Sequence, residues 1–234
     1  MSKLSLTFLL TFFLLSSYSL SAQNFYREKT SRDNIFSIGV GPSFAYLDNG
    51  GPYRDPSFKI KPSVSISLIK RLTNRFDLRA SGGIQWLEST RNANPTNQGR
   101  WFVNRSSFSV KGPAYYFDVM PSVNLIAFGN HMNRSRFNLY GGFGLGVMHT
   151  NTKQSNSYST DAVVYDRQIT TAYFPVRAGL SYTLGPYSEI AGEGTMFFTF
   201  SDDLDGNAGF NRYGDHLAQA QLVYRRYFHS RTDH

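Results

Sequence analysis

The sequence predicts an all-β fold, an eight-stranded antiparallel transmembrane β-barrel of the outer-membrane type, from three observations. Eight segments alternate apolar residues with small or polar ones, which is the period of a strand. The connections between them are alternately long and short. The polar faces carry charges, which suits a barrel with lipid outside and a polar lumen inside, whereas the apolar face of a soluble sandwich is its core.

The clearest strands form a hairpin over residues 172–200, which turns at Gly185-Pro186. Its first arm places Val176 and Leu180 on one face and Arg177 on the other. The same alternation occurs in residues 35–47, 58–72, 76–89, 115–127, 137–149 and 215–228.

The long connections are residues 48–57, 90–112, 150–168 and 201–214, which we assign to the outer side of the membrane. Aromatic girdles are expected at both ends of the strands. Prolines inside strands are unfavourable, and bulges could accommodate two of the four at positions 42, 62, 121 and 175.

Residues 1–22 have the pattern of a secretory signal peptide. Lys3 is followed by an apolar core at positions 4–15 and by small and polar residues up to position 22. Residues 23–234 are then expected to form a single barrel domain in the outer membrane.

The amino-acid composition limits the kinds of site that the chain can form and the kinds of partner that it can bind. The 234 residues include no cysteine, which excludes a disulfide framework and thiolate metal sites, and no cofactor is predicted. The net charge is +8, but no nucleic-acid recognition motif accompanies it and the chain has an export signal, so nucleic acid is not a predicted partner. Outer-membrane lipids and the phosphates of lipopolysaccharide are better partners for these cations. The alternative is that they are simply solvated loop charges.

Charged residues on the inward faces are expected to pair, because an isolated charge in a narrow lumen is costly. Arg177 and Glu193 lie at similar depths on neighbouring strands, as do Arg225 and Glu189. Since eight strands enclose a lumen that side chains can fill, we expect a plugged barrel with no open channel.

The last third of the chain, GEGTMFFTFSDDLDG followed by YGDHLAQAQLVYRRYF, resembles the closing hairpin of small outer-membrane barrels of Bacteroidota. With IGVGPSFAYLDNGGPY and RFNLYGGFGLGV, the order of motifs is most similar to the PorG-like barrels of type IX secretion. This chain has Ser-Asp-Asp-Leu-Asp at positions 201–205 where a Tyr-Leu-Asp-Asp type sequence is usual. The resemblance implies a non-enzymatic barrel that anchors periplasmic subunits of a secretion system.

Two sets of residues are candidate sites. Basic residues near the short turns are a possible docking surface for a periplasmic partner, or ordinary solvated turn residues; they are Lys70, Arg71, Arg75, Arg134 and Arg136. Asp203 and Asp205 have the alternate spacing of a calcium loop. Position 214, where the loop signature needs a glutamate, is glycine, so they are weak metal candidates and no metal site is predicted.

Two further functions stay open. A small porin-like or surface-binding barrel would use the loops at residues 90–112 and 150–168. A lipid-modifying enzyme would use His149 and His216 with Ser201 and Asp202, but no local motif places a nucleophile beside a base. The chain is therefore expected not to be an enzyme.

Overall fold

The computed structural model describes residues 33–47, 59–89, 99, 102–103, 107–126, 135–156, 163–207 and 214–228. The expected signal peptide lies outside them. The strands are β1 (Asn34–Tyr46), β2 (Lys61–Arg71), β3 (Phe76–Glu88), β4 (Ser109–Asn124), β5 (Phe137–Phe143), β6 (Leu145–Ser155), β7 (Val164–Thr183), β8 (Ser188–Thr199) and β9 (His216–Phe228). No helix in this part of the chain has the length and apolar content needed to cross a membrane.

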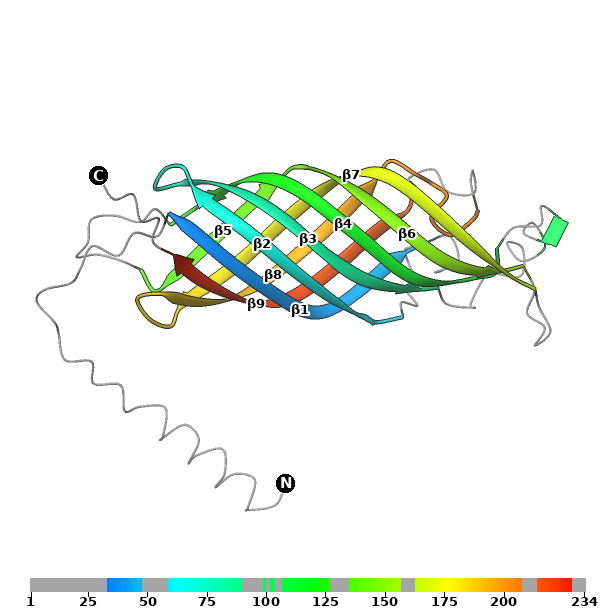
Figure 1. The fold of residues 1–234 in the computed structure, drawn as a ribbon, viewed down its shortest axis with the longest axis horizontal. Helices are drawn as coiled ribbons and strands as arrows, with labels where there is room; N and C mark the ends of the chain where they lie inside the picture. The colour runs from blue at the N-terminus through cyan, green and yellow to red at the C-terminus, as the bar shows by residue number, and fades with distance from the viewer. Residues whose placement is uncertain are drawn as a thin grey trace, which may run out of the picture. The chain divides into compact units, whose positions relative to one another are not determined.

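The strands form a closed antiparallel ring (Figure 1). Except for β5 and β6, consecutive strands pair with each other, and β9 closes the ring by pairing with β1, from Asn34 opposite Phe228 to Tyr46 opposite His216. Both β5 and β6 pair with β4 on one side and β7 on the other, so together they make one strand of the barrel. The predicted eight-stranded antiparallel fold is confirmed.

The interruption at Gly144 lies between two prolines on neighbouring strands, Pro121 and Pro175. Proline has no backbone N–H to donate, so the ladder loses bonds there, while Gly144 N still donates to the carbonyl of Pro175 over 3.1 Å. A Cβ at Gly144 would lie 2.2 Å from the carbonyl oxygen of Val119, so only glycine fits this close approach.

No residue is inserted at these prolines. Val119 opposes Leu145 and Ser122 opposes Gly142, three residues apart on each strand, so the register continues through Pro121. The same holds past Pro42, between the pairs Val40–Leu222 and Ser43–Gln219. These prolines therefore break the pairing locally without forming the bulges considered from the sequence.

Three strands are longer than predicted. β4 begins at Ser109 instead of 115, β6 continues to Ser155 instead of 149, and β7 begins at Val164 instead of 172. They extend past the other strands at one end of the ring (Figure 1). We call this the loop end, and the opposite end, with the connections β2–β3, β4–β5 and β7–β8, the turn end.

The two faces of the ring differ as the alternation predicts. Side chains of the outer wall are apolar and exposed, including Ile66, Leu68, Phe117, Leu145 and Leu222. Side chains of the inner face are buried and many are polar or charged, including Ser65, Arg79, Asp118, Arg177 and Arg225. Aromatic residues lie toward both ends of the outer wall, among them Phe76 and Tyr224 at the turn end and Trp86 and Tyr115 at the loop end.

Candidate functional site

A buried charge network fills the half of the lumen nearer the turn end, with Glu193 of β8 at its centre. Arg79 of β3 donates two hydrogen bonds to the Glu193 carboxylate, at 2.8 and 2.9 Å. Arg225 donates to it at 2.9 Å, and the Tyr140 hydroxyl donates at 2.6 Å. The paired arginine and glutamate side chains are no more than 5% exposed. Such charge-assisted and bidentate contacts are the strong class of hydrogen bond.

A second carboxylate extends this network. Arg177 lies between Glu193, at 3.9 Å, and Asp118, at 3.4 Å. The Tyr173 hydroxyl donates to Asp118 over 3.0 Å. Three arginines from β3, β7 and β9 thus share the carboxylates of β4 and β8 inside the barrel, which neutralises charges that would be costly to bury alone.

Both lumen pairs named from the sequence lie close together in the structure. Arg177 and Glu193 are 3.9 Å apart, and Arg225 and Glu189 are 4.0 Å apart. The shortest contact of Glu193 with a cation, however, is with Arg79, a pair that the sequence does not predict. β3 and β8 are not neighbours in the ring, so this contact spans the lumen and has no signal in local spacing.

The half of the lumen nearer the loop end holds an apolar cluster, which lies among buried polar side chains such as Gln85, Thr150 and Gln219. Phe197 is fully buried, with its ring centroid 4.9 Å from that of Tyr116 and 5.3 Å from that of Tyr173. Met148, Leu217 and Leu204 belong to the same cluster. Leu204 comes from the connection after β8, so this segment packs into the loop end of the barrel.

The two metal candidates, Asp203 and Asp205, lie in the segment that follows β8. We call its described residues, 200–207, the capping segment. Asp205 accepts a hydrogen bond from the backbone N–H of Asn207 at 2.9 Å, and Asn207 donates to the carbonyl of Ser107 at 3.0 Å. Asp203 forms an ion pair with Arg167. Among the residues that the structure describes, no three histidine, aspartate or glutamate side chains are placed to share a metal ion. The aspartates here organise a turn.

The basic residues expected at a docking surface lie at the turn end. Lys70, Arg75 and Arg136 are exposed. Arg71 is less available to a partner, because its side chain forms an ion pair with Asp77, with 3.3 Å between Nε and a carboxylate oxygen. Arg134 lies outside the described residues. The exposed cations therefore belong to the end of β2, the β2–β3 turn and the segment just before β5.

The histidines considered for an enzyme lie on different parts of the wall. His149 of β6 makes a 2.8 Å hydrogen bond with the hydroxyl of Thr170. His216 of β9 packs edge-on against Phe198, with the ring centroids 5.1 Å apart. β7 and β8 separate β6 from β9 in the ring, so the fold does not bring the two histidines together.

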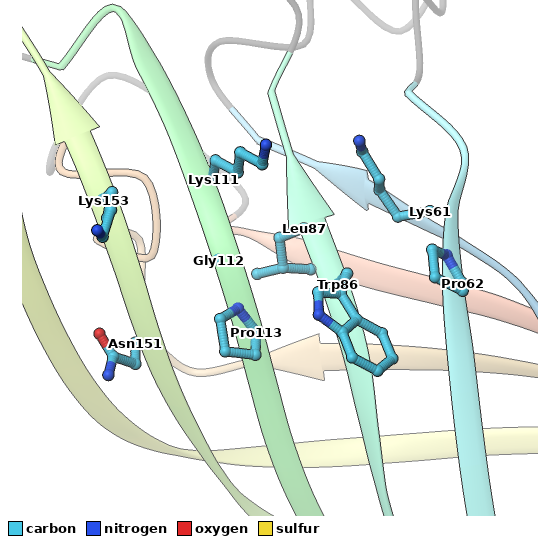
Figure 2. A pocket seen from close by; sticks show the side chains of 9 residues that line it. All are labelled: Lys61, Pro62, Trp86, Leu87, Lys111, Gly112, Pro113, Asn151 and Lys153. Carbon is cyan, nitrogen blue, oxygen red and sulfur yellow. The ribbon is translucent and has the colours of Figure 1, made fainter.

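A groove on the outer wall at the loop end was not predicted. It has a volume of about 680 Å³. Its lining comes from β2, β3, β4 and β6. Figure 2 shows Trp86 and two prolines below the lysines. The lining residues used below are Lys61, Pro62, Trp86, Lys111, Pro113 and Lys153. The sequence gives little sign of this groove, because its residues come from four separate strands.

The closed ring, the exposed apolar wall and the buried polar interior define a small β-barrel of the outer-membrane type. No protein-family model matches the chain, and no curated protein is similar to it in sequence. Among solved structures, it is similar to Neisserial surface protein A, with a TM-score of 0.52 and 12% identity over 86% of this chain and 100% of that one. This similarity shows the fold.

Two other solved structures are similar to the chain with lower TM-scores. A major outer membrane protein from Thermus thermophilus has a TM-score of 0.48 and 12% identity, over 82% of this chain and 99% of that one. The outer membrane protein OprG from Pseudomonas aeruginosa has a TM-score of 0.41 and 11% identity, over 87% of this chain and 100% of that one.

Proposed function

We propose that this chain is a closed, non-enzymatic barrel of the outer membrane that anchors a periplasmic partner through its turn end. The filled lumen is the observation that carries the proposal. With the Glu193 network in one half and the Phe197 cluster in the other, the interior is occupied by side chains, so the surfaces at the two ends are left for binding.

The turn end is the surface that suits a periplasmic partner. Lys70, Arg75 and Arg136 are exposed there, and cations on a surface steer an acidic partner toward it. The resemblance to PorG-like barrels supports a more specific proposal, in which the partner is a subunit of a type IX secretion system. A subunit with an acidic face would fit this end of the barrel.

The filled lumen predicts the absence of ion conductance. The purified chain, incorporated into a planar lipid bilayer, is expected to give no unitary current steps. The three buried arginines and the apolar cluster fill the lumen with side chains, which should leave no continuous aqueous path through the barrel. A porin added to the same bilayer serves as the positive control. Reproducible current steps from this chain would contradict the closed barrel and favour the porin-like alternative.

A pull-down of the tagged chain from gently solubilised outer membranes tests the anchoring role. Mass spectrometry is expected to find a periplasmic subunit in stoichiometric amount. The triple variant K70Q/R75Q/R136Q should recover roughly tenfold less of it, which corresponds to a loss of about 1.4 kcal/mol of binding free energy. The double variant K111Q/K153Q, which removes exposed cations at the loop end, is the matched control. A wild-type barrel that is recovered alone would refute the anchoring role.

A surface-binding barrel is the second candidate, and the groove lined by Trp86 and the three lysines favours it. This candidate uses the loop end and is compatible with a partner at the turn end, so the two can be tested separately.

A further inference from the structure

The outer wall at the loop end is arranged in rows that run across neighbouring strands. The register places Tyr115 of β4 between Ile84 of β3 and His149 of β6. One step further out, Trp86 opposes Pro113. One more step out is a charged row, in which Lys111 lies between Glu88 of β3 and Lys153 of β6. From the middle of the barrel outward, the wall therefore changes from apolar to aromatic and proline-rich, and then to lysine.

Two like charges face each other in the outermost row. Lys111 and Lys153 are directly opposed in an antiparallel pair, and both are exposed. Like charges at directly opposed positions are destabilising. An anion between the two ammonium groups would remove this repulsion.

The carboxylates nearby do not supply that anion. Glu88 opposes Lys111, but its two oxygens each form an ion pair with another lysine, Lys59 and Lys61. Asp166 of β7 opposes Lys153 on its other side and is exposed, and no ion pair within 4.0 Å joins the two. Among the described residues of this patch, four lysines thus face two carboxylates.

The floor of the groove is suited to a ligand that is not purely ionic. Trp86 is 40% exposed, and together with Pro62 and Pro113 it forms an apolar surface directly below the lysines (Figure 2). This surface continues into the exposed apolar wall at Val64, Tyr115 and Phe117. A ligand that matches all three zones has an anionic group at the top, a ring or other amphipathic body at the level of Trp86, and hydrocarbon below. A free anion would use the lysines alone.

We propose that this groove binds the phosphorylated sugar headgroup of a glycolipid in the outer leaflet. A phosphate lies between Lys111 and Lys153, the sugar rests on Trp86 and Pro113, and the acyl chains run down the apolar wall. Lysine binds phosphate as a point charge with three donors, and tryptophan is suited to the boundary between headgroups and hydrocarbon. This site is independent of the periplasmic anchoring proposed above.

Lipid binding to the purified full-length chain in detergent micelles tests the proposal. The probe is lipid A, and native mass spectrometry counts the lipid molecules that each barrel retains. The bisphosphorylated lipid is expected to bind, and its fully dephosphorylated form to bind roughly tenfold less tightly, a difference of about 1.4 kcal/mol. Equal binding of the two forms would overturn the proposal, as would full displacement of the lipid by millimolar inorganic phosphate, which would indicate a simple anion site.

Variants then locate the site. K111Q/K153Q should weaken binding by a similar factor, whereas K70Q/R226Q, which removes two exposed cations at the turn end, should leave it unchanged. E88Q removes a negative charge beside Lys111 and should strengthen binding, a gain that a merely destabilised barrel would not show. Unchanged binding by K111Q/K153Q in a folded barrel would refute the site, and so would equal losses in the two double variants.

Discussion

Replacing Glu193 with alanine is expected to lower the free energy of unfolding of the barrel by about 3–5 kcal/mol, the cost of breaking a buried ion pair by removing one partner. Glu193 accepts hydrogen bonds from Arg79, Arg225 and Tyr140, and Arg177 lies 3.9 Å away. Without its carboxylate, three buried guanidinium groups lose a shared counter-charge. Urea unfolding of the refolded barrel in lipid vesicles measures the change.

Glu189 provides the matched control for this variant. It is also a buried glutamate of β8, but its ion pair with Arg225 is longer, at 4.0 Å, and its hydrogen bond comes from the neutral hydroxyl of Thr183, at 3.2 Å. E189A should therefore be clearly less destabilising than E193A. If E193A and E189A cost the same, Glu193 is not the centre of the network.

Phe197→Ala is expected to destabilise the barrel by about 3–5 kcal/mol, the typical cost of deleting a buried phenylalanine ring. Phe197 is fully buried and packs between Tyr116 and Tyr173. Removing the phenyl group leaves a cavity between the capping segment and the charge network. The strands around it cannot move inward to fill it, because backbone hydrogen bonds hold them in the closed barrel. The same unfolding measurement reports the loss.

The neighbouring Phe198 is the internal control for this variant. It follows Phe197 on β8, points to the outer wall and is 37% exposed. Phe198→Ala removes the same atoms from a position where they contact lipid and His216, and should cost much less. A cost at Phe198 equal to that at Phe197 would mean that the apolar cluster in the lumen contributes no special packing.

The alternation in the sequence predicted the fold wherever one face of a strand meets lipid and the other meets the lumen. It failed at the ends of β4, β6 and β7. Residues 150–155, Thr-Asn-Thr-Lys-Gln-Ser, are polar on both faces, so they have no amphipathic period although they pair with β4 and β7. Backbone pairing that continues beyond the apolar band leaves no hydrophobic signature, so the sequence predicts loops where these strands continue.

The candidate sites were predictable only in part, for geometric reasons. Arg225 and Glu189 oppose each other on neighbouring strands, so their pairing can be predicted from their similar positions along the two strands. The contact of Arg79 with Glu193 crosses the lumen and depends on the tilt and stagger of the whole ring. The groove around Trp86 likewise depends on the register of four strands, which the order of residues along the chain does not give.

Ring closure between β1 and β9 also constrains how the barrel can assemble. This pairing joins strands from opposite ends of the chain, so it is among the least local contacts of the fold and forms only after β9 is available. Until then β1 and β8 each present a row of unpaired backbone groups, which hydrocarbon does not tolerate. A chain lacking β9 should therefore remain outside the bilayer or aggregate, rather than insert as a seven-stranded sheet.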